Sequence, residues 1–450
     1  MFGIKQQHEN KLTYTRIIAL GFMGMILFGG FLLSLPIATK SGDATLFLDA
    51  LFTATSATCV TGLVIYDTYT HWSVFGQLVI LVLIQIGGLG FMSIVTMASV
   101  FLGRRIGLSE RKLLVQSTSI MELGGSVALL KRIVFATIIF ETAGAILLAT
   151  RFCPLFGFKT GIYFAIFHSV SAFCNAGIDI LGGFGPFCSL APFQNDPIII
   201  LTITALIIIG GIGFIVWDDI YHKKYHFRSY RLHTKLVIIM TGLLLIGGTI
   251  LFLIFEYNHT LLGKPFLEKI LSSFFMATTP RTAGFSVVDL NKMSNSSSLL
   301  TMLLMFIGGS PGSTAGGIKT TTFAALVMAT VAASRHLPNV NVFKRRIENS
   351  IVRQATSIFS IYLFATLSAT MLICAITPFG LKEVLLEVIS AAGTVGLSAG
   401  ITPHLNIVSK ITILLLMYGG RVGILSLALV LAEKHQIAPV DRPTEKIILG

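Results

Sequence analysis

The sequence predicts an all-α membrane protein in which four tandem helix–short helix–helix repeats surround one pseudo-fourfold axis. Three observations predict this class: an apolar composition, uncharged stretches long enough to cross a bilayer, and an internal repeat. Of the 450 residues, 54% are hydrophobic and 12% are charged, and the mean hydropathy is +0.84. Because a soluble globular domain carries about 25% charged residues, this composition excludes a soluble protein.

Long apolar stretches without Asp, Glu, Lys or Arg provide the predicted membrane spans. They cover residues 17–35, 74–103, 198–216, 236–255 and 354–381. At a rise of about 1.5 Å per residue, each is long enough to cross hydrocarbon about 30 Å thick. The first stretch follows a short basic segment and shows no small-residue cleavage site, which predicts a retained first span.

The net charge of +13 is unevenly distributed along the chain. Alternate loops, among them 104–112, 223–235 and 335–353, carry far more Lys and Arg than Asp and Glu, whereas the loops between them are balanced. An excess of Lys and Arg marks the cytoplasmic side of a membrane protein. The pattern therefore predicts a multi-pass plasma-membrane protein with both termini in the cytoplasm. The positive charge indicates topology, and no nucleic-acid partner is expected.

An internal repeat with a period of about 110 residues is the most specific signal. Each repeat contains an apolar span, a short helix-length segment, a glycine loop, and a second span with a Gly-Gly pair. The short segments cover 45–57, 161–173, 265–277 and 382–392, and they are too short to cross a membrane. The loop glycines are Gly62, Gly177, Gly284 and Gly396, and the pairs are Gly87-Gly88, Gly210-Gly211, Gly308-Gly309 and Gly419-Gly420.

These features divide the chain into repeats at 1–103, 104–222, 223–335 and 336–450, the last with a C-terminal tail. They predict eight transmembrane helices plus four re-entrant pore helices around a pore. Non-helical backbone survives at membrane depth only where it is buried in protein or lines water, so the glycine loops are expected to meet on one axis. Glycine leaves room beside a pore, and backbone carbonyls can replace the hydration shell of a cation. The loops therefore predict a cation pore with a carbonyl selectivity filter.

The second span of the third repeat is interrupted at 308–317. Proline and glycine break helices, and a break inside a membrane lies against the pore. We interpret residues 308–318 as a movable intramembrane gate. Its residues are Gly308, Gly309, Ser310, Pro311, Gly312, Ser313, Thr314, Ala315, Gly316 and Gly317.

Two basic residues are predicted to act with this gate. Arg421 follows the fourth Gly-Gly pair in an otherwise apolar span, where a charge is costly. We expect it to contact gate-loop carbonyls below the filter and to slow cation passage; the alternative is a structural pair with Glu141. Lys319, directly after the gate loop, either faces the inner cavity or extends toward the membrane surface.

The chain resembles the Trk/Ktr/HKT superfamily of potassium transporters, in particular the bacterial KtrB/KtrD-type membrane subunits, over nearly its whole length. The resemblance is carried by I-Q-I-G-G-L-G-F at 84–91, T-P-R-T-A-G-F at 279–285 and the broken span of the third repeat. It implies potassium as the transported ion, bound at the filter only. The implied filter residues are Val60, Thr61, Gly62, Asn175, Ala176, Gly177, Thr282, Ala283, Gly284, Thr394, Val395 and Gly396. It also implies a homodimer in a bacterial membrane, regulated by a cytosolic RCK-type nucleotide-binding subunit (KtrA/KtrC-like).

Alternatives to potassium uptake stay open at this point. One is transport of Na⁺ or NH₄⁺, and another is Na⁺-coupled K⁺ symport. A third is an intramembrane hydrolase built on Ser310 in a G-x-S-x-G match, which would need a His or Lys partner at the same depth, and none is evident. The five cysteines form no C-x-x-C pair, so neither a disulfide framework nor a metal site is expected. We predict no cofactor and no enzymatic activity in this chain.

Overall fold

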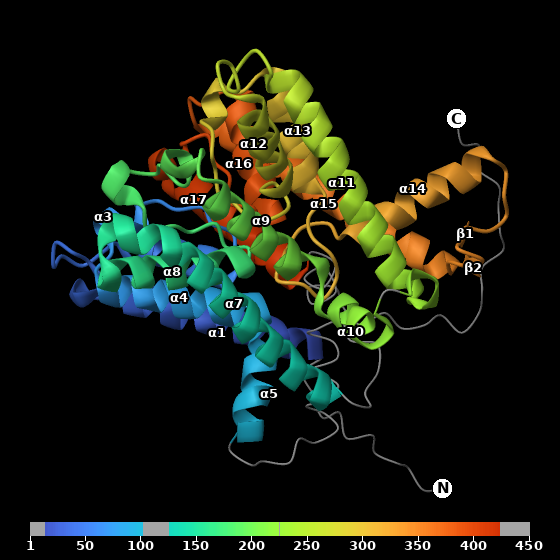
Figure 1. Cartoon of the computed structure of the whole chain (residues 1–450), viewed down its shortest axis with the longest axis horizontal. Helices are drawn as coiled ribbons and strands as arrows, with labels where there is room; N and C mark the ends of the chain where they lie inside the picture. The colour runs from blue at the N-terminus through green and yellow to red at the C-terminus, as the bar shows by residue number, and fades with distance from the viewer. Residues whose placement is uncertain (1–13, 102–125, 225, 424–450) are drawn as a thin grey trace, which may run out of the picture.

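The computed structural model describes residues 14–101, 126–224 and 226–423, and these are mostly helical (Figure 1). Three segments used in the topology prediction lie outside the described residues: the first thirteen residues, the basic stretch 104–112, and the tail from 424 to 450. The membrane orientation predicted from their charges therefore stays a prediction.

Four long apolar helices begin the successive units of the fold: α1 (Tyr14–Ser34), α7 (Ser126–Phe156), α11 (Leu232–Glu256) and α15 (Asn349–Ile376). Each is long and apolar enough to cross a membrane. Each packs against the short helix that follows it: α2 (Phe47–Thr58), α8 (Phe158–Phe173), α12 (Phe266–Thr278) or α16 (Leu381–Gly393). The short helices lie where the sequence predicts them, except that α8 begins three residues earlier.

A second helix follows each short helix: α4 (Val74–Leu89), α9 (Pro197–Ile212), α13 (Asn295–Phe306) and α17 (Ile407–Val422). All four begin at a polar N-cap whose side chain accepts a backbone N–H: Ser73, Asp196, Ser294 and Asn406. Such caps satisfy donors that the first helical turn leaves without a partner. The second helices therefore have well-defined starts.

The ends of the second helices differ from the prediction. The sequence indicated a break only after α13, where the gate loop leads to α14 (Thr320–Ser334), but α4, α9 and α17 also end at a glycine with positive φ: Gly90, Gly213 and Gly423. Beyond them lie α5 (Phe91–Phe101) and α10 (Phe214–Lys223), and α10 is bent by 92° from α9. The sequence predicts eight spans, one of them broken, whereas the described residues contain four helices of spanning length, or five with the bent α9–α10 pair.

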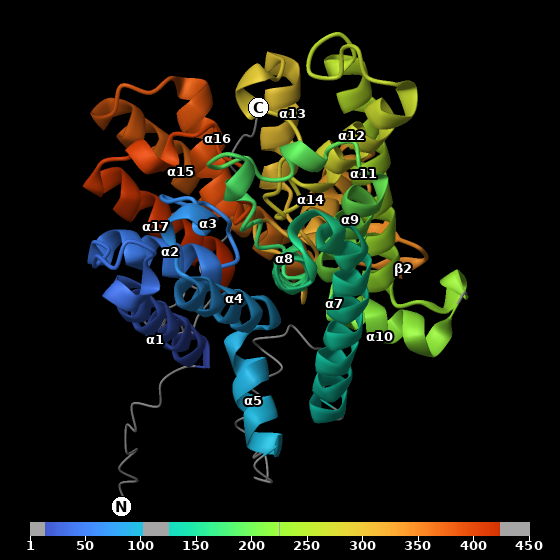
Figure 2. The same cartoon turned by 60° about the vertical axis from the view of Figure 1, so that its left-hand side comes forward.

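The packing of these helices closes a circle. Each second helix contacts the short helix of the following unit: α4 packs on α8, α9 on α12, α13 on α16, and α17 returns to α2. Helices far apart in sequence, such as α17 and α2, therefore lie side by side, while α5 and one end of α7 extend away from the bundle (Figures 1 and 2).

The connections contain short 3₁₀ helices, a one-turn α-helix and one hairpin. These are η1 (Pro36–Ala38), η2 (Gly182–Phe184), η3 (Ala191–Phe193), η4 (Phe227–Ser229), η5 (Leu290–Lys292), η6 (Thr402–His404), the one-turn helix α3 (Thr68–His71), and the antiparallel strands β1 (Asn341–Val342) and β2 (Arg345–Arg346).

Apolar side chains cover both the inside and the outside of the bundle. Phe52, Phe167 and Phe275 on the short helices are fully buried. Phe28 on α1 and Phe364 on α15, by contrast, are 63% and 68% exposed. Exposed aromatic and aliphatic residues on long helices are what contact with lipid requires.

Candidate ion pathway

The four glycine loops, at 58–63, 174–178, 280–285 and 393–397, meet at one place and are called the filter loops below. A Cβ atom added to Gly62 would lie 2.5 Å from the carbonyl oxygen of Ala176 and 3.1 Å from the Cα of Gly396. A Cβ on Gly284 would lie 3.2 Å from the Cα atoms of both Gly177 and Gly396. The loops are therefore too closely apposed for any side chain at these glycines.

The carbonyl oxygens of the filter loops follow the same circular order as the helices. Each filter glycine lies against the carbonyl oxygen of the residue preceding the glycine in a neighbouring loop. These oxygens belong to Ala176 beside Gly62, Ala283 beside Gly177, Val395 beside Gly284, and Thr61 beside Gly396. Four equivalent carbonyls thus surround the point where the loops meet. Such oxygens can hold a dehydrated cation without an acidic side chain.

The filter loops share an unusual backbone conformation. The residue two positions before each glycine has positive φ, although none is a glycine: 56° at Val60, 59° at Asn175, 66° at Thr282 and 50° at Thr394. The glycines also have positive φ. Alternating handedness turns consecutive peptide groups to one side of the chain. Non-glycine residues hold this conformation only where their surroundings enforce it, and here it occurs at the same position in all four loops.

Four buried hydroxyl residues, Ser56, Ser171, Thr279 and Ser390, hold the filter loops and were not predicted from the sequence. Their backbone carbonyls accept the N–H groups of the preglycine residues at 2.7–2.9 Å. The hydroxyls of Ser56 and Ser390 accept the N–H of Gly62 and Gly396, each at 3.0 Å. The other two hydroxyls instead donate to carbonyls just beyond the glycine, Ser171 to Ile178 at 2.6 Å and Thr279 to Phe285. A hydroxyl residue five or six positions before each loop glycine is the sequence signal that could have identified them.

The Gly-Gly pairs explain how the second helices approach the filter. Gly87, Gly210 and Gly420 lie directly against the carbonyl oxygens of Thr58, Phe173 and Ala392. These three residues occupy the same position, four residues before the filter glycine. A side chain there would push the second helix away from the C-terminus of the short helix, so small residues are required at this contact.

The gate loop, residues 308–318, lies against the filter loops. Thr314 Oγ1 donates to the carbonyl of Phe173 and contacts Oδ1 of Asn175, each at 3.3 Å, and Gly316 lies against the side chain of Thr394. The backbone N–H of Ser310 donates to the carbonyl of Gly211 at 3.0 Å. The loop is thus held between α9 and the start of two filter loops.

Arg421 and Lys319 both donate to backbone carbonyls at the gate loop. Arg421 donates to Thr314 in this loop, to Gly87, and to Gly88 at 3.0 Å. In the described part of the chain it forms no ion pair with Glu141, whose carboxylate instead accepts a hydrogen bond from Gln85 at 3.2 Å. The alternative partner considered from the sequence is therefore not the one observed.

Lys319 contacts the gate loop that precedes it, and its predicted orientation toward the inner cavity or the membrane surface stays a prediction. Its Nζ turns back and donates to the carbonyls of Ala315 at 2.6 Å and Gly316 at 3.5 Å. Two basic side chains, one from α17 and one directly after the gate loop, therefore donate to gate-loop carbonyls beside the filter loops.

Ser310 does not have the surroundings of a hydrolase nucleophile. Its hydroxyl is buried and lies 3.0 Å from the hydroxyl of Thr320. Within the described residues, no His or Lys side chain hydrogen-bonds to it. A serine without a base partner is not activated for attack.

A cavity of about 540 Å³ lies on the other side of the filter loops and is lined by all four filter glycines. Asp67, Asp179 and Asp289 also line it. Burial, together with the nearby Asp67 carboxylate, raises the pKa of Asp179 to about 6. At neutral pH these carboxylates give the cavity a negative potential that attracts cations.

Comparison with known proteins agrees with this geometry. The family model TrkH, described as a cation transport protein, matches residues 30–439. The chain is 42% identical to the potassium/sodium uptake protein NtpJ of Enterococcus hirae, over 99% of both chains. It is 37% identical to the Ktr system potassium uptake protein B of Bacillus subtilis, over 98% of this chain and 97% of the relative.

A solved structure shares the fold at low sequence identity. The crystal structure of the potassium transporter TrkH from Vibrio parahaemolyticus matches with a TM-score of 0.71 at 19% identity, covering 96% of this chain and 87% of that chain. The resemblance seen in the sequence motifs is thereby confirmed, and this multi-pass membrane protein belongs to the TrkH family of cation transport proteins.

Proposed function

We propose that the chain takes up potassium across the plasma membrane of a bacterium through a pore formed by four repeats around a pseudo-fourfold axis. The repeats divide at 1–103, 104–222, 223–335 and 336–450. The observation that carries the proposal is the ring of carbonyl oxygens from Thr61, Ala176, Ala283 and Val395. Relatives named for potassium uptake support the choice of ion.

In this proposal K⁺ enters the acidic cavity, loses water to the carbonyl ring, and then meets the gate loop and its two cations. Arg421 holds the loop by its backbone oxygens, and its charge slows the ion until the loop withdraws. Inward movement of one charge through 100 mV releases about 2.3 kcal/mol, which supports roughly fifty-fold accumulation. The uptake therefore requires no ATP-hydrolysing domain in this chain.

Partners of the chain belong to the same proposal. A homodimer, and a separate cytosolic RCK-type subunit that moves the gate, are implied by the resemblance to Ktr subunits. The relatives named as proteins of a Ktr system support a multi-component assembly.

A second candidate function is uptake of sodium, or of potassium coupled to sodium. It is favoured by one relative, which is named as a potassium/sodium uptake protein. Carbonyl rings of similar geometry bind either ion, so selectivity depends on small differences in the size and rigidity of the ring.

The Gly62→Ser variant tests the proposed filter. Its side chain would enter the space beside the Ala176 carbonyl, so we expect K⁺ uptake to fall at least about tenfold or its preference over Na⁺ to be lost. Gly42→Ser is the matched control, because Gly42 also has positive φ but has open space around it. Uptake of K⁺, Na⁺ and NH₄⁺ would be measured in cells lacking their own uptake systems, with and without external Na⁺. Unchanged transport in Gly62→Ser would refute the filter assignment.

A further inference from the structure

The bend between α9 and α10 places α10 at a right angle to a membrane-spanning helix. Gly213, with φ of 106°, makes the 92° turn. The bend leaves the carbonyl of Ile209 without its helical partner, and Trp217 Nε1 donates to it at 3.1 Å. Phe214 and Val216 are buried, so the first turn of α10 is anchored in the bundle. In the orientation proposed above, with α9 crossing the membrane, the 92° bend directs the remainder of α10 along the membrane plane.

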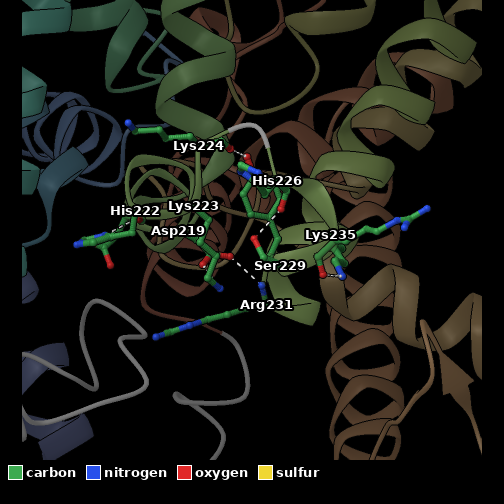
Figure 3. A network of polar contacts seen from close by, with 11 residues as sticks. Asp219, His222, Lys223, Lys224, His226, Ser229, Arg231 and Lys235 are labelled. Carbon is green, nitrogen blue, oxygen red and sulfur yellow. Dashed lines mark hydrogen bonds and ion pairs between the residues drawn. The ribbon is translucent and has the colours of Figure 1, made fainter.

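The far end of α10 and the following η4 form an exposed basic surface. Lys224, Arg228 and Arg231 are all exposed. Buried Asp219 holds the segment in place, because it pairs with Lys223 at 2.7 Å and accepts the backbone N–H of Arg231 at 2.8 Å. Figure 3 shows this network, with Asp219 joined to the start of α11 through Arg231.

Two of these three basic side chains have no ion-pair partner within the described part of the chain. The side chains of Lys224 and Arg228 form no ion pair there, although their backbone carbonyls accept Tyr230 OH and Lys235 Nζ. Aromatic rings lie among the charges: Tyr221 is 75% exposed and Phe227 is 40% exposed. Exposed aromatic and basic residues together are typical of segments that lie in the lipid headgroup region.

We propose that this basic surface, formed by the exposed Lys224, Arg228 and Arg231 with Tyr221 and Phe227, binds the phosphate groups of anionic lipids in the cytoplasmic leaflet. The proposal rests on the orientation proposed above, which puts the loop 223–235 inside the cell. A membrane fits better than an acidic protein partner. The helix lies along the membrane plane, and the aromatic side chains suit the boundary between headgroups and hydrocarbon.

The same helix connects this surface to the gate loop. The backbone N–H of Phe214, the first residue of α10, donates to the carbonyl of Gly312 at 2.7 Å. A Cβ on Gly213 would lie 2.7 Å from the carbonyl oxygen of Pro311. Movement of α10 toward the headgroups therefore acts directly on the gate loop, so bound anionic lipid sets how readily the gate opens.

The test uses the full-length chain reconstituted in vesicles of phosphatidylcholine, with or without added phosphatidylglycerol. Binding of headgroup-labelled phosphatidylglycerol is measured in detergent, and K⁺ flux is measured in the vesicles. The variant Lys224→Gln/Arg228→Gln removes two of the charges. Lys40→Gln/Lys159→Gln is the matched control, because both lysines are exposed on the predicted outer side.

We expect the wild-type chain to bind phosphatidylglycerol and to respond to it with a several-fold change in K⁺ flux. Each basic residue near an anionic surface strengthens binding about fivefold, so the test variant should bind at least about tenfold more weakly and lose the flux response. Its flux in phosphatidylcholine alone should equal that of the wild type. The control should bind and respond normally.

An undiminished response in the test variant, an equal loss in the control, or lipid binding without any change in flux would overturn the proposal. Absence of K⁺ flux in every vesicle would instead count against the proposed transport function, because lipid binding is measured separately.

Discussion

At the scale of single residues, the filter depends on the hydroxyls of Ser56, Ser171, Thr279 and Ser390 as much as on its glycines. Two of these hydroxyls accept an N–H and two donate to a carbonyl beyond the glycine. The carbonyls of Ile178 and Phe285 are therefore held by hydroxyls, whereas the other two loops use their hydroxyls on the glycine N–H. Four similar loop sequences thus form a carbonyl ring, but the hydroxyl hydrogen bonds around this ring are not fourfold symmetric.

The Ser171→Ala variant tests this role. It removes the 2.6 Å hydrogen bond to the Ile178 carbonyl and leaves this buried carbonyl without that donor. The loss lowers the stability of the loop by about 1–3 kcal/mol. Because the freed peptide can turn, we expect K⁺-over-Na⁺ selectivity to fall roughly tenfold, as measured by competition uptake. Ser169→Ala is the control, since Ser169 donates to the carbonyl of Glu141 and not to a filter loop. Equal selectivity in the two variants would contradict the role.

At the scale of helices, the Gly-Gly pairs allow each of three second helices to touch the C-terminus of a short helix. The sequence predicts the short helices well, because their apolar pattern, length and following glycine are local features. It does not predict the breaks at Gly90, Gly213 and Gly423, because glycine inside a membrane helix is equally compatible with close packing. Only in the third repeat does a proline, Pro311, lie at the break, and it excludes a continuous helix on local grounds.

The neighbouring glycines Gly210 and Gly211 provide a matched pair of variants. A Cβ on Gly210 would collide with the carbonyl of Phe173, whereas a Cβ on Gly211 would lie 3.4 Å from Asn175 Nδ2. We expect Gly210→Ala to lower the free energy of unfolding by about 1–3 kcal/mol and to reduce uptake. Gly211→Ala should have a much smaller effect. Thermal unfolding in detergent measures the difference, and similar melting temperatures would show that the helix contact is unimportant.

At the scale of the whole molecule, a single ion pair, with its carboxylate buried and its ammonium partly buried, joins the first short helix to the last second helix among the described residues. Lys410 Nζ on α17 lies 2.6 Å from Asp49 Oδ1 on α2, and Tyr66 OH donates to the other carboxylate oxygen at 2.8 Å. This contact lies where α17 and α2 complete the circle of helices. It therefore links the first and fourth units at the point where the circle closes.

The Lys410→Met variant tests whether this ion pair stabilises the circle of helices. It leaves the buried Asp49 carboxylate without its cation, and breaking a buried pair costs about 3–5 kcal/mol. We expect a lower melting temperature and reduced K⁺ uptake, with partial recovery in Asp49→Asn/Lys410→Met, because the double variant leaves no buried charge unpaired. If the double variant were less stable than Lys410→Met, the pair would not act as proposed.

The sequence predicts much of this arrangement but not the contacts within it. The loop glycines are predicted by their repeated order and the gate loop by the break in the third repeat, and the structure brings these segments together. The contact of Arg421 with a gate-loop carbonyl, Thr314, is as predicted, but its bonds to Gly87 and Gly88 were not predicted, because those carbonyls come near only once non-adjacent helices pack together. A sequence lists charged side chains but does not show which backbone oxygens will lie near them.

One quarter of the circle is built differently from the others. In three units the Gly-Gly pair supports the end of the short helix, but in the third unit Gly308 lies against Gly316 of its own gate loop, and α13 packs against α11 and α16. The unit that lacks this support is also the unit that carries the proposed gate loop. In the proposed function, withdrawal of this one loop opens the pathway from one side only. The switch between closed and open should therefore be abrupt, while the other three units stay still.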